Sequence, residues 1–333
     1  MVQRVVSGIR PTGRLHIGNY FGAVQSFIAL QDKHPCYFFI ADFHSLTTHP
    51  TPGDLQGSVR TVLAEYLAAG LDPDRTTLYL QSDLPETAEL YLYLNMNAYL
   101  GELERVSSFK EKARSQPDNI NAGLLTYPVL MAADILLHKG THVPVGKDQE
   151  QHLEMARTFG NRFNRLYKAE VFPEPQAFSA GESLIRVPGL TGSGKMSKSA
   201  GDADCIYLAE PADSLQKKIM RAKTDTGPTA PGEPMSQELQ NLFDLMSLVT
   251  PADAIAHFRE AHANATIRYG DMKKQLAADM ETFIAPWRER IEATINDDAL
   301  LERTARIGAE KARQSALETL REVRSCIGLR NIY

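Results

Sequence analysis

The chain has 333 residues, of which 43% are hydrophobic and 23% charged, and its net charge at pH 7 is −5. This composition is typical of a folded globular protein and excludes a disordered or low-complexity chain. The negative net charge argues against a protein whose whole surface binds nucleic acid, although it does not exclude a local basic patch. The length predicts a large domain together with a smaller one.

The sequence also bears on the compartment. We expect neither export nor membrane insertion, because no charged leader with an apolar core and no apolar run of about 18 residues is seen. The three cysteines, Cys36, Cys205 and Cys326, are odd in number and far apart in the chain, which argues against a disulfide framework or a CxxC metal site. We therefore expect a cytoplasmic protein with reduced cysteines.

The first predicted elements are a strand, a glycine-rich turn and a helix. Apolar residues over 2–9 indicate a buried strand, and the stretch "SGIRPTGRLHIGNYFGA" at 7–23 leads into helical spacing of apolar side chains. His16 and Asn19 fall where that helix begins. Free backbone N–H groups and the positive end of the helix dipole favour an anion there. We expect this turn to meet a phosphate group.

Strand and helix patterns then alternate along the first half of the chain. This alternation predicts a Rossmann-like, doubly wound parallel sheet with helices on both faces, and a ligand beyond the carboxyl ends of its strands. Thr51, Pro52 and Asp54 supply start signals for the first of the longer helices. The predicted strands are 35–42, 76–82 and 142–146, and the predicted helices are 55–71, 85–100, 121–138 and 148–167.

The pattern changes after about residue 173, where prolines and glycines mark a loop-rich crossing. Beyond residue 210 nearly all of the signal is helical, which predicts a second, smaller, all-helical domain. The predicted helices are 213–223, 236–249, 252–263 and one long stretch over 267–326.

A second glycine-rich stretch, "GLTGSGKMSKSAG", occupies residues 189–201. Its glycines and Lys195 match a phosphate loop except at the last position, where Met196 replaces the Ser or Thr that would hold magnesium. The stretch also follows the sheet, so the phosphate loop is disfavoured. Lys195 and Lys198 suit a mobile clamp on phosphate charge. A solvated basic loop is the alternative.

The stretch "LLTYPVLMAADILL" at 124–137 places Tyr127, Met131 and Asp134 on one face of a helix. A carboxylate among apolar residues is costly unless it meets a donor. An indole offers one N–H donor and no acceptor, whereas a phenol offers both, so a lone carboxylate beside Met131 favours indole. Alternatively, Asp134 pairs with Lys139 or caps neighbouring backbone.

Two short motifs carry a resemblance to a known family. "HIGN" at 16–19 and "KMSKS" at 195–199 resemble the HIGH and KMSKS signatures of class I aminoacyl-tRNA synthetases. The second matches at all five positions, whereas Asn19 replaces the final histidine of the first. Asparagine still donates a hydrogen bond but carries no charge.

Longer stretches resemble the bacterial tryptophanyl members of that family. They are "SGIRPTG", "GELERVSSFKEKA" at 101–113, the stretch 124–137, and "VPVGKDQEQHLEMAR" at 143–157. In the tyrosyl relatives a glutamine stands about where Met131 stands here, which favours tryptophan. Arg10 and Val6 replace a glutamine and a larger aromatic residue found in some members, and this leaves ATP contacts and pocket size open.

The resemblance implies an activity, substrates and partners. It implies a ligase that joins L-tryptophan to ATP, releases pyrophosphate and charges the terminal ribose of tRNA(Trp), with Mg²⁺ held through the ATP phosphates. It also implies a homodimer. Residues 1–192 would form the Rossmann-like catalytic domain that binds ATP and tryptophan, and residues 193–205 the KMSKS loop. Residues 206–333 would form the helical tRNA-recognition domain, with the last helix packing back on the catalytic domain.

The resemblance also assigns site residues position by position. His16, Asn19, Lys195 and Lys198 would stabilise charge on the reacting phosphates, Gly146 would let adenosine approach, and Asp148 would accept from the ribose. The ATP-binding set is Arg10, Thr12, Gly18, Gly146, Asp148, Met196 and Ser197, and the tryptophan-binding set is Gly8, His44, Tyr127, Met131, Asp134, Val143, Val145 and Gln149.

Several features have simpler explanations. His138 and His142 lie four apart, but no third ligand has suitable spacing, so no metal site is predicted. The cation-rich stretches 217–223 and 301–333 meet tRNA phosphates or are only solvated helix faces. We expect Trp287, the single tryptophan, to pack inside the helical domain.

Three other functions stay open on the sequence. The first is the tyrosine-specific enzyme of the same fold, which Met131 disfavours. The second is another nucleotidyltransferase, which the Asp134 face and "KMSKS" disfavour. The third is a tryptophan-sensing paralogue that binds without charging tRNA, against which the intact His16, Lys195 and Lys198 argue.

Overall fold

The computed structural model of the chain describes residues 3–115, 117–144, 150–178, 185–192 and 194–329. Its internal contacts divide it into two compact units. The sheet unit comprises Met1–Gly13, Ser26–Ser183 and Asp297–Tyr333, and the helical unit comprises Arg14–Gln25 and Leu184–Asn296. In the described residues, no helix has the length and apolarity that a membrane crossing requires.

The core of the sheet unit is a parallel sheet with the strand order β3-β2-β1-β4-β5. Its central strands are rich in buried apolar side chains, as expected for a sheet covered on both faces. Val5 of β1 pairs with Cys36 of β2 on one side and with His142 of β4 on the other. The strands are β1 (Val5–Ile9), β2 (Cys36–Ile40), β3 (Thr77–Leu80), β4 (His142–Val143) and β5 (Gln176–Ala177).

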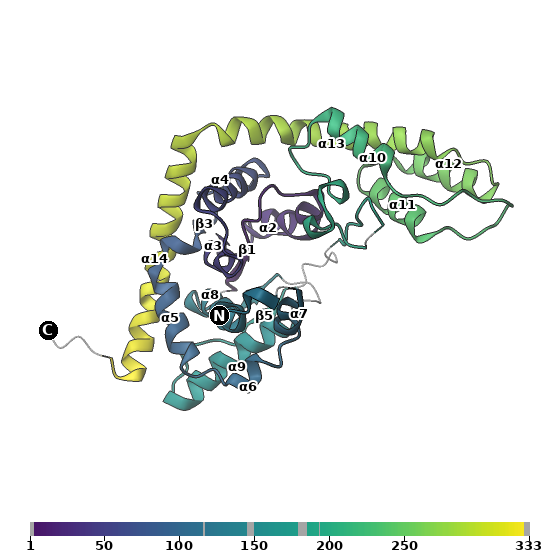
Figure 1. The fold of residues 1–333 in the computed structure, drawn as a ribbon. Coiled ribbons are helices and arrows are strands. Elements are labelled where there is room, and N and C mark those ends of the chain that lie inside the picture. The colour runs from purple at the N-terminus through teal and green to yellow at the C-terminus, as the bar shows by residue number, and fades with distance from the viewer. Residues whose placement is uncertain (1–2, 116, 145–149, 179–184, 193, 330–333) are drawn as a thin grey trace. The chain divides into compact units, whose positions relative to one another are not determined.

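The connections between strands confirm the predicted doubly wound fold. The helices α2 (Gln25–Leu30) and α4 (Pro52–Ala68) precede β2 and β3, whereas α8 (Ala122–Leu137) and α9 (Glu150–Tyr167) precede β4 and β5. Right-handed crossovers put the first pair on one face and the second pair on the other, as Figure 1 shows. The strand order reverses between β1 and β4, which is where such folds bind ligands.

Local sequence signals explain where the helices begin. Thr51 caps α4 by accepting a hydrogen bond from the Asp54 N–H, and Pro52 stands in the first turn, as predicted. Asn121 caps α8 in the same way, accepting from the Leu124 N–H at 2.9 Å. The start of α8 is therefore fixed, and with it the direction in which Tyr127 and Asp134 point.

Between β3 and α8 the chain forms three helices where one was predicted over 85–100. The helix α5 (Pro85–Asn95) ends early, and the short helices α6 (Leu100–Leu103) and α7 (Ser107–Ser115) follow. The sequence did not predict α6 and α7, because Gly101 lies within α6 and the polar sequence of α7 has little periodic apolar pattern. Smaller helical turns also follow the strands: α3 (Asp42–Ser45), the 3-10 turn Leu46–Thr48 and the 3-10 turn Gln81–Asp83.

The long C-terminal helix α14 (Asp298–Ile327) belongs to the sheet unit and runs beside α5 and the edge strand β3 (Figure 1). Gly308 lets it approach, because a Cβ there would lie 1.7 Å from the carbonyl oxygen of Leu78. Arg324 anchors the helix through Glu89, with Nε to Oε1 at 2.6 Å. The helix thereby covers a strand edge that would otherwise be open to pairing.

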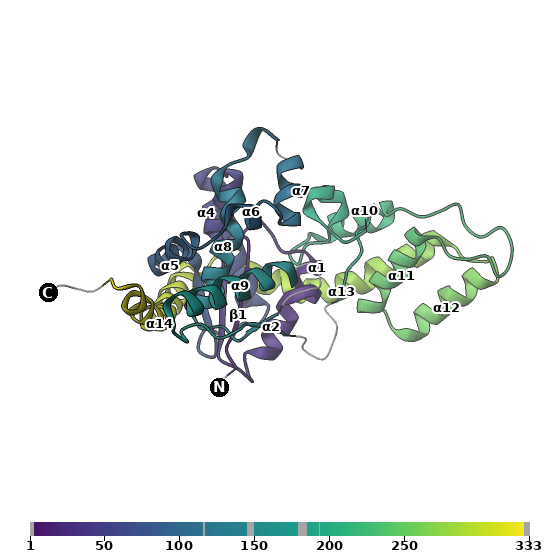
Figure 2. The same cartoon turned by 90° about the horizontal axis from the view of Figure 1, so that it is seen from below.

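The helical unit holds α1 (Ile17–Asn19), the π-helical turn Tyr20–Val24, α10 (Ala212–Arg221), α11 (Gln237–Val249), α12 (Ala252–Ala263) and α13 (Tyr269–Ile295). Figures 1 and 2 show α11 and α12 side by side. The stretch 267–326, predicted to be helical, forms two helices. The chain breaks at Asn296 and Asp297, where Asp297 caps α14 through the Leu300 N–H. Trp287 is buried and lies 4.7 Å from the Tyr20 ring, between ring centroids, as expected of a packing residue.

Candidate active site

A cavity of about 420 Å³ lies in the sheet unit at the carboxyl ends of β1 and β4. Its walls come from β1 and the residues after it, from β2 and α3, and from α7, α8 and α9. This is the switch point of the sheet, so the topology alone explains why a cavity forms there. The lining residues are Val6, Ser7, Gly8, Arg10, Phe39, Ala41, His44, Thr47, Ser108, Tyr127, Met131, Asp134, Ile135, Val143, Pro144 and His152.

Asp134 is the buried carboxylate of this cavity, only 2% exposed. Its Oδ1 accepts a hydrogen bond from Nε2 of Gln81 at 2.7 Å, and its Oδ2 lies 3.0 Å from Nε2 of His44. Burial raises the pKa of Asp134, and the hydrogen bonds from His44 and Gln81 oppose that rise. The prediction of a lone carboxylate was wrong, because two side chains from neighbouring elements reach it. Lys139, the alternative partner, bonds Glu322 instead.

Tyr127 lies about two turns before Asp134 on α8 and also lines the cavity. Its hydroxyl is 2.9 Å from Nε2 of His152 on α9 and contacts the Ser108 hydroxyl of α7. The Ser108 Oγ is also 2.9 Å from the same His152 nitrogen. This three-way contact joins α7, α8 and α9 at the cavity wall and fixes the phenol ring. Neither Ser108 nor His152 was among the predicted site residues.

The floor of the cavity is formed by β1. Gly8 is required there, because a Cβ would lie 2.5 Å from the Phe39 ring of β2. Val6 also lines the cavity, and its small side chain leaves room that a larger aromatic residue would fill. Arg10 follows β1 and faces the cavity with its Nε buried and without a hydrogen-bond partner among the described residues. Burial lowers the pKa of Arg10.

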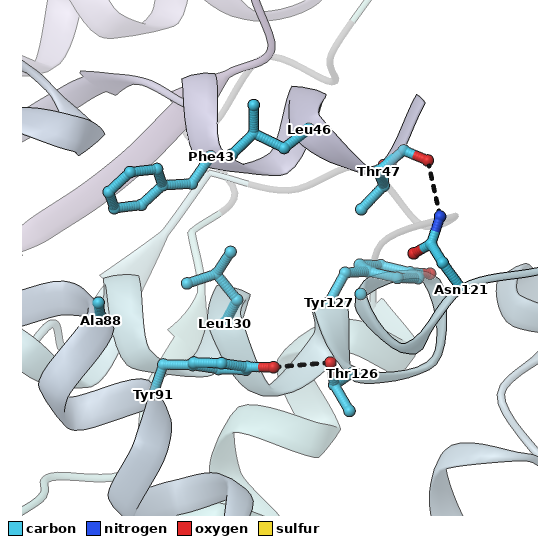
Figure 3. Close-up of a pocket in the computed structure, with 10 residues that line it drawn as sticks. Phe43, Leu46, Thr47, Ala88, Tyr91, Asn121, Thr126, Tyr127 and Leu130 are labelled. Carbon is cyan, nitrogen blue, oxygen red and sulfur yellow. Dashed lines mark hydrogen bonds between the residues drawn. The ribbon is translucent and has the colours of Figure 1, made fainter. Parts of the chain in front are cut away.

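A second, shallower cavity of about 310 Å³ adjoins the first in the sheet unit. Figure 3 shows its mostly apolar wall, with Tyr91 bonded to Thr126 and Asn121 bonded to the Thr47 carbonyl. Thr47 and Tyr127 line both cavities. A change at either residue therefore alters both cavities.

His16 and Asn19 lie at the start of α1, the helix entrance that was predicted. They belong to the helical unit, whereas the predicted domain 1–192 placed them with the sheet. The His16 N–H donates to Oδ1 of Asn19 at 3.0 Å, and the Asn19 N–H donates to the His16 carbonyl at 2.8 Å. Asn19 thus closes the turn through its own side chain. Nδ1 of His16 has no hydrogen-bond partner among the described residues and is 2.9 Å from where a Cβ of Gly18 would stand. Glycine at 18 therefore leaves the imidazole room.

The structure brings the KMSKS loop into the same unit as His16. Met196 is buried, its N–H donates to the Val187 carbonyl at 2.9 Å, and its Cβ lies 3.6 Å from the built Cβ of Gly18. The buried Asp204 accepts from the Ser197 N–H at 3.2 Å and from the Thr191 N–H at 2.9 Å. The loop is thus anchored from inside by one carboxylate.

Burial, together with the positive charges of Lys198 and Lys195, lowers the pKa of His16 to about 4. The imidazole is therefore neutral at pH 7 and offers hydrogen bonds but no charge. Lys195 is exposed and Lys198 half-buried. Such an arrangement attracts anions without a buried unpaired cation.

The remaining predicted site residues divide as follows. Arg10 and Thr12 belong to the sheet unit, whereas Gly18, Met196 and Ser197 belong to the helical unit. Val143 lines the cavity. Val145, Gly146, Asp148 and Gln149 lie outside the described residues. Thr12 is exposed, and its N–H donates to the Arg10 carbonyl.

Many of the cations singled out in the sequence have partners. In 217–223, Lys218 bonds Glu210 and Lys223 bonds Glu238, which leaves Lys217 and Arg221 exposed.

In 301–333, Arg313 and Arg324 pair with Glu86 and Glu89 of α5. His138 is buried, and its Nε2 lies 2.9 Å from the Tyr79 hydroxyl. It is therefore a core residue with a hydrogen-bond partner. Within the described ranges, no group of three or more His, Cys, Asp or Glu side chains could hold a metal.

The comparisons with known proteins agree with this architecture. The doubly wound sheet with a cavity at its switch point defines an α/β protein of the nucleotide-binding type. Residues 2–285 match the family model described as tRNA synthetases class I (W and Y). The chain therefore belongs to the class I tRNA synthetase family of tryptophan and tyrosine enzymes.

Individual relatives are similar over their whole length. The chain is 58% identical to a tryptophan–tRNA ligase from Porphyromonas gingivalis, covering 99% of this chain and 100% of the relative. A tryptophan–tRNA ligase from Clostridium perfringens is 37% identical, covering 98% and 97%. Among solved structures, the tryptophanyl-tRNA synthetase of Campylobacter jejuni complexed with ADP and tryptophan superposes with a TM-score of 0.86 at 33% identity, covering 98% of this chain and 100% of that one.

Proposed function

We propose that this chain is a tryptophan–tRNA ligase, which activates L-tryptophan with ATP and passes the aminoacyl group to the 3′-terminal ribose of tRNA(Trp). The observation that carries the proposal is the buried Asp134 beside Met131 in the cavity of the sheet unit. A buried carboxylate offers the acceptor that an indole N–H needs, and the thioether beside it offers a polarizable apolar contact. The full-length relatives named tryptophan–tRNA ligase support it.

In this proposal the cavity selects and orients the amino acid. The indole lies among Val6, Gly8 and Met131, and its N–H donates to Asp134. The Tyr127 hydroxyl contacts the substrate ammonium as an acceptor, its position fixed by Ser108 and His152. Gln149, implied by the resemblance to lie near the substrate amino group, is the other proposed contact for that ammonium. The apolar walls exclude water from the indole, which strengthens the contact with Asp134.

The chemical step needs charge stabilisation more than a nucleophile from the protein. The tryptophan carboxylate attacks the α-phosphate of ATP, and the P–O bond to pyrophosphate breaks. Lys195 and Lys198 stabilise the departing charge, and the neutral His16 with Asn19 donates to the phosphate oxygens. Mg²⁺, bound through the ATP phosphates, would offset their remaining charge. Arg10, Thr12, Gly18, Gly146, Asp148, Met196 and Ser197 remain the proposed ATP contacts.

The proposal includes a homodimer, supported by an exposed apolar patch at the end of α5 and the start of α6. Leu92, Met96, Tyr99 and Leu100 are 48 to 75% exposed, which is costly for a monomer and suits an interface with a second copy. A Met96→Glu variant is expected to sediment as a monomer, whereas an exposed change outside the patch, Lys274→Glu, is expected to leave a dimer. A monomeric wild type would contradict this part.

Recognition of tRNA would fall to the helical unit, whose α10 exposes Lys217 and Arg221. Replacing both by alanine is expected to raise KM for tRNA and leave amino-acid activation unchanged. Such an enzyme meets its tRNA in the cytoplasm, a location that cell fractionation would test. An unchanged KM for tRNA would place recognition elsewhere.

The test of the function is exchange of labelled pyrophosphate into ATP, measured with each of the twenty amino acids in turn. We expect tryptophan to support exchange at a rate at least 100-fold above that with tyrosine, because the phenol oxygen, itself an acceptor, meets a carboxylate that only accepts. A preference for tyrosine would identify the tyrosine-specific relative. Tryptophan binding without exchange, in a chain with intact lysines, would favour a sensing protein.

A further inference from the structure

The side chain of Gln81 is completely buried between the end of β3 and the two elements that carry the candidate indole contact. It directly follows β3, in the 3-10 turn Gln81–Asp83. A buried carboxamide is costly unless its N–H and C=O groups are hydrogen-bonded. Its presence here, where an apolar side chain would pack without that requirement, calls for a role.

Both ends of the Gln81 carboxamide have one fixed partner. Nε2 donates to Oδ1 of Asp134 on α8 at 2.7 Å, and Oε1 accepts from the backbone N–H of Phe43 on α3 at 3.1 Å. The Phe43 N–H can only donate and the carboxylate only accepts, so the carboxamide has a single satisfied orientation. Gln81 is therefore a rigid brace between α3 and the carboxylate.

The two oxygens of Asp134 differ in what surrounds them. The partner of Oδ1 is Gln81, which is not part of the cavity lining, whereas the partner of Oδ2 is His44, which is. Oδ2 is thus the oxygen on the side of the cavity. With Oδ1 held from behind, the carboxylate cannot rotate about its last bond without losing a charge-assisted hydrogen bond.

We propose that Gln81 is a positioning residue that fixes the Asp134 carboxylate so that Oδ2 meets the substrate's N–H, and that it thereby sets discrimination for an indole. This inference rests on the proposed function, since it assumes that the cavity holds tryptophan. The brace orients the acceptor before substrate arrives, so that less binding energy goes into ordering it. Gln81 itself does not touch the substrate.

The test compares binding of tryptophan with binding of 3-(benzothiophen-3-yl)alanine, in which sulfur replaces the indole N–H and the ring shape is retained. Dissociation constants are measured by calorimetry for the wild type and for Gln81→Met. We expect the wild type to prefer tryptophan, and Gln81→Met to reduce that preference by about tenfold, because a misoriented acceptor loses most of a hydrogen bond to a charged group. Binding of the sulfur analogue should change much less.

Gln31 provides the matched control. It is another buried glutamine of the sheet unit, with Nε2 donating to the Gly70 carbonyl and Oε1 accepting from the Asp72 N–H, both at 2.9 Å, and it does not line the cavity. Gln31→Met removes an equivalent pair of buried hydrogen bonds. It should leave the ratio of the two dissociation constants unchanged. An equal fall in both variants would mean that general loosening, and not the brace, sets the ratio.

A second variant and a second readout guard against a misfolded protein. Gln81→Asn keeps the carboxamide but is one methylene short of bridging Phe43 and Asp134, so it should lower the preference in the same direction. Removing the Gln81 hydrogen bond should also raise the pKa of Asp134, since that bond lowers it. Among the described residues, His44 and Asp42 on α3 and Tyr79 on β3 also act on this carboxyl. Loss of tryptophan affinity on acidification should therefore begin at a higher pH in the variant.

The outcomes separate this inference from the function on which it rests. If the wild type binds both compounds equally, no N–H contact exists, and the proposed tryptophan pocket fails together with the brace. If the wild type prefers tryptophan and both Gln81 variants keep that preference within twofold, the pocket stands and the positioning role is overturned. A selective fall in both Gln81 variants, absent in Gln31→Met, supports the inference.

Discussion

The cavity around Asp134 in the sheet unit is built from buried side chains that hold one another, whereas the KMSKS loop in the helical unit is held by its backbone and exposes its charge. In the cavity, Gln81 and His44 fix a carboxylate. In the loop, Asp204 anchors backbone N–H groups and Lys195 stays exposed. Recognition of a shape needs rigid, dry surroundings, whereas stabilising a charge that appears during reaction needs cations that can follow it.

The largest effect should come from the lysines. Lys195→Ala or Lys198→Ala should lower kcat for pyrophosphate exchange by roughly 100-fold to 1,000-fold, the usual loss when one stabilising group of a transition state is removed. KM for tryptophan should change little, because the cavity is intact. Lys274→Ala on α13, also exposed, serves as the control and should leave kcat unchanged. A rise in KM for tryptophan with kcat unchanged would contradict this prediction, because it would mean that these lysines contribute to binding of the substrate and not to stabilising the transition state.

The second effect concerns the stability of the sheet unit. Gly308→Ala places a Cβ 1.7 Å from the Leu78 carbonyl oxygen, so α14 must move off β3, at a cost of about 3 kcal/mol. The matched change is Gly270→Ala in α13, where a Cβ meets nothing within 4 Å. This substitution should alter the free energy of unfolding by less than about 1 kcal/mol. Chemical denaturation measures both. Equal effects would mean that α14 does not pack closely on the edge strand.

A smaller effect should appear on acidification. Burial lowers the pKa of His138 to about 3, below the value of about 6.5 for an unfolded histidine. The unfolded chain therefore takes up the proton first, and the contribution of His138 to stability, intact above pH 6.5, is lost as pH falls from 6.5 toward 3. The loss at pH 5 relative to pH 7 should be on the order of 2 kcal/mol. Chemical denaturation of the wild type and of His138→Gln at both pH values tests this prediction. The free energy of unfolding should fall less in the variant than in the wild type, and equal falls would contradict the prediction.

The sequence predicted the fold well because its signals are local. Alternating apolar strands and capped helices predict a doubly wound sheet, and the Thr51 cap of α4 formed as expected. The division of the helical stretch 267–326 into two helices was not predicted, because its signal, the Asp297 cap that starts α14, is hidden in a strongly helical sequence.

The candidate site was predictable only in part. The face with Tyr127, Met131 and Asp134 follows from helical spacing, and these residues do line one cavity. The partners Gln81 and His152 come from other elements, so no local pattern reveals that they meet. One signal was present for Gln81, since a polar residue directly after a buried strand lies at the carboxyl edge of the sheet, where ligands bind.

We propose that Asp134 selects tryptophan by accepting its indole N–H. The most direct measurement is pyrophosphate exchange as a function of tryptophan concentration, for the wild type and Asp134→Ala side by side. We expect KM for tryptophan to rise by roughly 100-fold in the variant while KM for ATP stays within a few-fold, because a buried hydrogen bond to a charged group contributes about 1.5 to 3 kcal/mol. An unchanged KM for tryptophan in Asp134→Ala would contradict the claim.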